Sequence, residues 1–194
     1  MQPVDKPGGS GYNQKAMADK DALCTVLIDR RQIADTVSRL AAEISCDYRG
    51  KNPLLVAVLK GSFIFVADLV RLLDFPLEVD FIRLSSYGSG RESCGKVEVV
   101  HEIGADIEGR HVLVVEDIVD TGLTISFLLD YLKKKGAASV KLCSLADKPS
   151  RRQVPVSIDY LGFTVPDKFI VGYGIDWDEK FRYLPDICVV GEEK

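Results

Sequence analysis

Short apolar runs alternate along this chain with segments in which apolar residues recur every three or four positions. Runs rich in valine, leucine and isoleucine predict strands, whereas the three-to-four spacing predicts helices that bury one face. The predicted strands are 54–59, 78–84, 111–116 and 139–145, with a return near 169–172; the predicted helices are 29–48, 63–73 and 125–135. Asp29 and Gln32 have the spacing of a capping box at the first helix, and Gly136 suits the end of the third.

The most informative stretch is 111–124, HVLVVEDIVDTGLT. A buried strand leads into the acids Glu116, Asp117 and Asp120, and Thr121 and Gly122 then open a helix. A helix N-terminus offers unpaired amide hydrogens and a partial positive charge to a phosphate, and glycine allows close approach. The acids instead suit ribose hydroxyls, a metal ion or a proton. A sugar phosphate uses both halves, although a capped strand–helix connection or a magnesium-binding acidic pocket would also explain the pattern.

Two further segments are weaker signals by themselves. Lys60-Gly61-Ser62 follows another predicted strand and precedes a helix, so it is a second candidate anion site. The small polar residues of 85–90 are typical of a surface loop, and 97–100 is expected to return as its other arm.

Composition narrows the class of protein. The 194 residues are 46% hydrophobic and 28% charged, which is typical of one globular domain. A net charge of −4 argues against a general affinity for nucleic acid or anionic membranes. Five dispersed cysteines and two histidines make a zinc site unexpected and favour a reducing compartment. Without a membrane-spanning run or signal-peptide pattern, we expect a cytoplasmic protein with no membrane partner.

The glycine-rich start of the chain differs from the rest. Residues 1–20 carry little apolar content and include Pro-Gly-Gly-Ser-Gly, so we expect a disordered tail. Residues 21–194 are expected to form a single domain.

The full central string resembles the phosphoribosyl-pyrophosphate motif of type I phosphoribosyltransferases. That motif is four apolar residues, two acids, two apolar residues and Asp-Thr-Gly-x-Thr, and every position fits. The resemblance extends over about 23–190. The Leu-Lys-Gly-Ser loop, the Ser-Tyr pair, Lys148 and the segment VPDKFIVGYGIDWDEKFRYLP are similar to the hypoxanthine-guanine branch of the family. It implies an α/β fold with a mainly parallel central sheet flanked by helices, and a small hood formed by the chain ends.

The resemblance also implies a reaction. A 6-oxopurine, hypoxanthine or guanine, would take the phosphoribosyl group from phosphoribosyl pyrophosphate with Mg²⁺ present, giving inosine or guanosine monophosphate plus pyrophosphate in purine salvage. Asp120 would be the catalytic base. The residues implied in substrate binding are Leu59, Lys60, Gly61, Ser86, Tyr87, Glu116, Asp117, Ile118, Val119, Thr121, Gly122, Leu123, Thr124, Lys148, Phe169, Ile170 and Arg182.

Individual roles follow from the same resemblance. Lys148 would read the purine O6, and Phe169, which the sequence alone leaves equally open to core packing, would stack on the base. Glu116 and Asp117 would hold the ribose hydroxyls and, with Asp176, the magnesium ion. The backbone near Thr121 to Thr124 would hold the 5′-phosphate. Further roles implied are a cis Leu59–Lys60 peptide bond and Arg182 at the pyrophosphate, and Ser86 and Tyr87 at the start of a closing loop.

Two other classes stay open. One is a non-catalytic nucleotide-sensing regulator on the same fold, against which the acidic net charge and the complete base-binding segment argue. The other is an unrelated magnesium-dependent phosphotransferase whose acids accept a phosphoryl group. The preference among purines is not fixed by the sequence, and relatives lead us to expect a homodimer or homotetramer.

Overall fold

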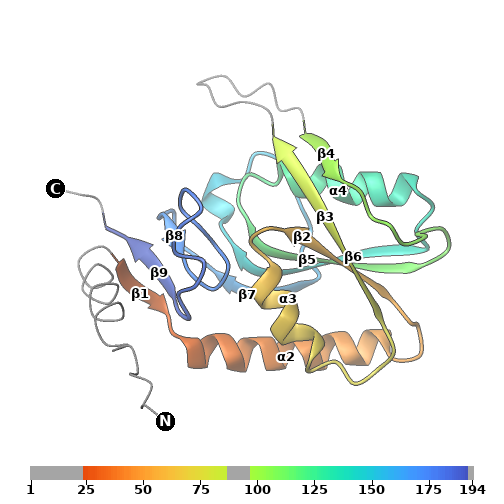
Figure 1. Cartoon of the computed structure of the whole chain (residues 1–194), viewed down its shortest axis with the longest axis horizontal. Helices are drawn as coiled ribbons and strands as arrows, with labels where there is room; N and C mark the ends of the chain where they lie inside the picture. The colour runs from red at the N-terminus through yellow and green to blue at the C-terminus, as the bar shows by residue number, and fades with distance from the viewer. Residues whose placement is uncertain (1–23, 87–96, 192–194) are drawn as a thin grey trace, which may run out of the picture.

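The computed structural model describes residues 24–86 and 97–191, and its centre is a six-stranded sheet (Figure 1). The strand order is β4-β3-β2-β5-β6-β7. All neighbours are parallel except the edge pair β3 and β4, which is antiparallel. The strands are β2 (Leu54–Leu59), β3 (Glu78–Ser86), β4 (Val97–His101), β5 (His111–Val119), β6 (Ser139–Asp147) and β7 (Tyr160–Thr164).

Helices cover both faces of this sheet. α2 (Arg30–Tyr48) and α3 (Phe63–Val70) lie on one face and α4 (Leu123–Lys134) on the other (Figure 1). Successive residues of β2 alternate between them: Leu55 and Ala57 pack with α2 and α3, whereas Leu54 and Val56 pack with α4. Because both faces are covered, these strands are apolar at almost every position.

The predicted start of α2 and the predicted glycine at the end of α4 are confirmed. Asp29 caps α2, accepting hydrogen bonds from the amides of Arg31 and Gln32, while the Gln32 side chain accepts one from the Asp29 amide at 2.9 Å. After α4, Gly136 adopts φ +84°, a conformation that favours glycine.

The hood is a second sheet, built from both ends of the described chain. β1 (Cys24–Ile28), β9 (Ile187–Val190) and β8 (Ile170–Val171) pair antiparallel in that order. The Arg30 guanidinium fixes the hood to the start of α2 through Asp186, with 3.1 Å between Nη2 and Oδ2.

Several predicted boundaries and one predicted strand placement were wrong. The strand predicted near 169–172 is part of the hood and not of the central sheet. The strand that pairs with β6 at that edge of the central sheet is β7. β7 was not predicted because Gly162 interrupts its apolar pattern. A Cβ added to Gly162 would lie 2.3 Å from the Leu145 carbonyl oxygen, so the close packing of β7 on β6 requires a glycine there. β5 continues past the predicted end at 116 to Val119 and keeps its pairing with β6, so Asp117 is in the strand rather than after it. α3 ends at Val70, where bonds such as Leu72 N to Leu69 O tighten the last turn.

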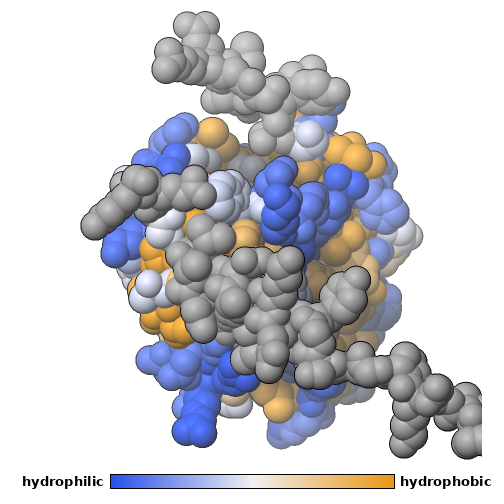
Figure 2. All heavy atoms as spheres, turned by 60° about the vertical axis from the view of Figure 1, so that its left-hand side comes forward, coloured by the Kyte–Doolittle hydropathy of each residue, from blue (hydrophilic) through white to orange (hydrophobic). Residues whose placement is uncertain are grey.

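The carboxyl ends of the five parallel strands share one edge, and the loops after β2 and β6 contact the hood and the segment leading into it there. Hydrophilic and hydrophobic residues are interspersed on the hood side of the molecule (Figure 2). Within 24–86 and 97–191, no helix is both long enough and apolar enough to cross a bilayer.

Candidate active site

The loop between β2 and α3 forms one wall of the site. The Leu59–Lys60 peptide bond is cis, as the resemblance implied. Gly61 lies directly against β5, because a Cβ added there would come within 1.8 Å of the Asp117 Oδ2 atom. On its other side, a Cβ added to Gly174 of the hood would lie 2.1 Å from the Gly61 carbonyl oxygen. The loop is therefore held between the acidic strand and the hood, where no side chain fits.

Two acids at the end of β5 lie in surroundings that disfavour their charge. Burial, and then the neighbouring Asp117 charge, raises the pKa of Glu116 well above its ordinary value. The Glu116 Oε2 atom is buried without a hydrogen-bond partner in the described structure. Burial also raises the pKa of Asp117 to about 6, although two backbone amides and Arg182 oppose the shift. Such carboxylates suit a ligand that brings hydroxyl donors or a cation.

The turn after β5 is the candidate phosphate site. Gly122 has φ +85° and is the N-cap of α4, so the N-cap itself offers no side chain, and the Thr121 hydroxyl accepts from the Leu123 amide at 3.4 Å. The Thr121 carbonyl accepts hydrogen bonds from the amides of Gln153 and Val154, at 2.9 and 3.2 Å. Because the first amides of a helix have no partner inside the helix, this supported turn presents donors to an anion.

Asp120 stands at the start of that turn. One of its oxygens, Oδ1, lies 3.4 Å from the Nε atom of Arg151 and accepts no hydrogen bond within the described residues. Arg151 belongs to a short 3₁₀ helix, η1 (Pro149–Arg151), and also lies 3.9 Å from Asp167. Asp120 Oδ1 is therefore paired with the Arg151 charge but accepts no hydrogen bond, and sequence reasoning missed this arginine neighbour.

The opposite wall presents a buried lysine and an exposed aromatic ring. The Lys148 amide bonds the Val119 carbonyl at 3.0 Å, which ties this wall to the motif, and Lys148 Nζ donates to the Lys168 carbonyl at 2.9 Å. The next residue, Phe169, is 57% exposed, so core packing is excluded for it. Its ring meets Trp177 edge-on at 5.9 Å between centroids. An ammonium donor beside an open ring face suits a flat heterocycle with a carbonyl oxygen.

A charged network joins the hood to the β2–α3 loop. Arg182 Nη1 donates to the Gly174 carbonyl at 2.8 Å, and Nη2 lies 2.8 Å from Asp176 and 3.2 Å from Glu179. The second Glu179 oxygen accepts from Lys60 Nζ at 2.8 Å. Sequence reasoning missed Glu179, because a spacing of three residues predicts pairing with Arg182 only on a helix, and this segment is not helical.

The other predicted residues are placed as follows. Ile118 and Val119 are in β5, Leu123 and Thr124 begin α4, and Ile170 is buried in β8. Ser86 is the last residue of β3, and Tyr87 lies outside the described residues, as does the tail 1–20. In the same described part, no three His, Cys, Asp or Glu residues are grouped so that they could hold a metal by themselves.

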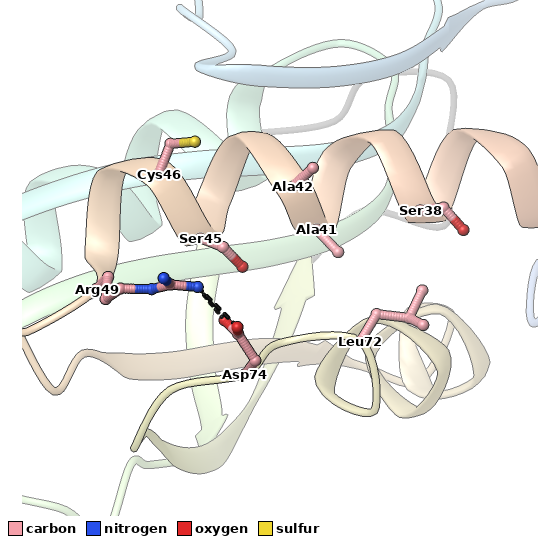
Figure 3. A pocket seen from close by; sticks show the side chains of 8 residues that line it. All are labelled: Ser38, Ala41, Ala42, Ser45, Cys46, Arg49, Leu72 and Asp74. Carbon is pink, nitrogen blue, oxygen red and sulfur yellow. Dashed lines mark hydrogen bonds and ion pairs between the residues drawn. The ribbon is translucent and has the colours of Figure 1, made fainter.

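A separate groove lies between α2 and the segment after α3 (Figure 3). Small residues and Leu72 line it, and the Arg49–Asp74 ion pair spans it at 2.6 Å. It lies beyond the C-terminal end of α3, whereas the candidate site is at that helix's N-terminal end. None of the acids or the lysine described above lines it.

Comparison with known proteins agrees with this geometry. A family model described as phosphoribosyl transferase domain matches residues 27–178. The chain belongs to this family, and its fold is that of the type I phosphoribosyltransferases.

Particular relatives are similar over most of the chain. The hypoxanthine-guanine phosphoribosyltransferase of Streptococcus pneumoniae strain R6 is 47% identical, with 87% of this chain and 93% of the relative covered. A crystal structure of a hypoxanthine-guanine phosphoribosyltransferase from Bacillus anthracis has 46% identity and a TM-score of 0.83, covering 87% of this chain and 99% of that one. The bifunctional TilS/HprT protein of Listeria innocua is 45% identical over 87% of this chain, which spans only 26% of that longer relative.

Proposed function

We propose that this chain transfers the phosphoribosyl group of phosphoribosyl pyrophosphate to hypoxanthine or guanine, giving the nucleoside monophosphate and pyrophosphate. The observation that carries the proposal is the Lys148–Val119 hydrogen bond, which holds a purine-type subsite against the phosphate-type turn. Neither subsite alone would indicate a transfer reaction. Relatives named as hypoxanthine-guanine phosphoribosyltransferases support it.

The residues divide the chemical work. Breaking the anomeric C–O bond leaves positive charge on the ribose, which nearby carboxylates offset. The purine attacks through one ring nitrogen, and Asp120, whose Oδ1 accepts no hydrogen bond within the described residues, takes the proton from the other. Lys148 donates to the purine O6, and Phe169 supports the ring. Lys60 and Arg182 hold the pyrophosphate.

We further propose that the reaction depends on Mg²⁺. Asp117 and Asp176 would hold it with Glu116 beside them, and the buried Glu116 carboxylate, whose Oε2 has no hydrogen-bond partner within the described residues, fits a nearby cation. A bound magnesium ion neutralises charge on the leaving pyrophosphate. Magnesium commonly uses only one or two carboxylates together with substrate phosphates, so the chain itself needs no larger cluster.

The deciding experiment incubates the protein with phosphoribosyl pyrophosphate, Mg²⁺ and each purine base separately. Chromatography should identify inosine or guanosine monophosphate in equal amounts with pyrophosphate, and omission of Mg²⁺ should abolish both products. Nucleotide binding without turnover would instead indicate a regulator. A phosphorylated protein would indicate a phosphotransferase.

Assembly and location complete the proposal. We propose a cytoplasmic homodimer or homotetramer, with no nucleic acid or membrane partner, which suits a net charge of −4. Light scattering at several protein concentrations would give the mass in solution, and a monomeric mass at every concentration would refute self-association.

A further inference from the structure

The hood segment that carries Glu179 is a tightly wound turn. Asp178, Glu179 and Phe181 all have positive φ, and Trp177 and Lys180 pair through two hydrogen bonds of 3.2 and 3.0 Å. The Glu179 amide donates to Asp176 Oδ2 at 2.8 Å. These backbone contacts hold the Glu179 backbone in place independently of the contacts of its carboxylate.

The Glu179 carboxylate bridges two cations that come from opposite sides of the site. Oε1 accepts from Lys60 Nζ of the β2–α3 loop at 2.8 Å, and Oε2 accepts from Arg182 Nη2 of the hood at 3.2 Å. A glutamate side chain held by two cations is an anion at neutral pH. The side chain of Glu179 is 63% exposed, so its position reflects these charges rather than packing.

Lys60 and Arg182 are the same two cations that the proposed function assigns to pyrophosphate. We propose that Glu179 is an internal competitor, a carboxylate that holds the pyrophosphate subsite in the free protein and returns to it when pyrophosphate leaves. This inference rests on the proposed function. Its consequence is weaker binding of phosphoribosyl pyrophosphate and easier release of the product.

The remaining contacts allow this exchange without loss of the site. When Glu179 moves away, Arg182 still donates to the Gly174 carbonyl and pairs with Asp176, both at 2.8 Å. The guanidinium therefore stays in place. Lys60 is 45% exposed and can follow the incoming anion. Pyrophosphate must break the two ion pairs of Glu179 in order to bind, and this lowers its affinity by about 2- to 20-fold.

The test is Glu179→Gln, which keeps the size of the side chain and the cost of its positive φ. Calorimetric titration with pyrophosphate in Mg²⁺ buffer should give a Kd lower than that of the wild type by about 2- to 20-fold. The KM for phosphoribosyl pyrophosphate should fall in parallel while the KM for hypoxanthine is unchanged. Asp178→Asn is the matched control, because it removes the same charge from the same turn but contacts Lys180 at 3.8 Å rather than Lys60 or Arg182.

A double-mutant cycle separates competition from a general charge effect. In a Lys60→Ala background, the gain from Glu179→Gln should shrink, because one of the two contested cations is gone. An unchanged or raised Kd for pyrophosphate in Glu179→Gln would overturn the proposal, as would an equal gain in Asp178→Asn. If the wild type forms nucleotide but Glu179→Gln shows no gain, competition fails and the proposed function stands. If no variant forms nucleotide or binds pyrophosphate, both fail.

Discussion

Asp120 is the residue on which the proposed chemistry depends most directly. A carboxylate just before a helix often caps it, but α4 has Gly122 at its N-cap, and the Leu123 amide donates to the Thr121 hydroxyl at 3.4 Å. Asp120 Oδ1 lies 3.4 Å from Arg151 and accepts no hydrogen bond within the described residues, so this oxygen does not cap the helix. We predict that Asp120→Asn lowers kcat by at least about 100-fold, since an amide cannot take the purine proton.

Stability and ligand affinity are the controls for this variant. Thermal melting and calorimetric binding of phosphoribosyl pyrophosphate should stay near the wild-type values. Most of the activity remaining at saturating substrates would remove Asp120 from the role of base.

Lys148 should decide which purines react. It carries only hydrogen-bond donors, so it complements the O6 of hypoxanthine or guanine and not the 6-amino group of adenine. We predict poor turnover of adenine, and Lys148→Ala should weaken the discrimination between bases while the affinity for phosphoribosyl pyrophosphate changes little. Steady-state kinetics with each base would measure this. Adenine turnover comparable to that of hypoxanthine would contradict the assignment.

Residues differ in how far the sequence could predict them. Glu116, Asp117, Asp120 and the glycine turn were predicted from one contiguous string. The ion pair between Glu179 and Lys60 joins residues 119 positions apart, so it could not be predicted from any local sequence pattern. The exposure of Phe169 also had to come from the structure, because an aromatic residue before a short apolar run fits a core equally well.

At the scale of elements, the contact between the β2–α3 loop and β5 is the tightest in the site. Gly61→Ala would direct a methyl group to within 1.8 Å of the Asp117 carboxylate, and the loop or the acid must move. We predict that this variant loses at least about 10-fold in kcat/KM, because a misplacement of about 1 Å commonly costs 100-fold. Steady-state kinetics would measure the loss.

Gly104→Ala is the matched control for this prediction. Its added Cβ would meet only Asp80 Oδ2, at 3.8 Å, which is ordinary contact. Its kcat/KM should stay within about twofold of the wild-type value, because no catalytic group has to move to make room for the added methyl group. Equal losses in both variants would show that the Gly61 contact has no special role.

Elements with a strong periodic signal were predicted well, and short ones were not. The buried strands β2, β5 and β6 and the amphipathic helix α2 have long apolar patterns that only one structure satisfies. β8 has two residues and β7 contains a glycine, so pairing with distant strands, rather than local sequence, decides where they belong.

At the scale of the whole molecule, the buried carboxylates of the site lower the stability of the fold when they are ionised. The pKa of Asp117 is raised to about 6, from 3.8, mainly by burial. A carboxyl group whose pKa is higher in the folded state stabilises the fold below pH 4, and this contribution is lost as pH rises through about 6. Wild-type stability at neutral pH is therefore reduced by ionisation of this group.

We predict that Asp117→Asn increases the free energy of unfolding at pH 7.5 by about 2 to 3 kcal/mol, from a shift of about two pKa units. At pH 4.5 the difference should fall to about 1 kcal/mol, because the group is then largely neutral in the folded state but already mostly ionised in the unfolded chain. Denaturant titrations at both values in magnesium-free buffer would measure it, with Asp130→Asn, which changes an exposed carboxylate of α4, as the control. A difference between wild type and Asp117→Asn that does not grow with pH would show that this carboxylate is not destabilised by burial.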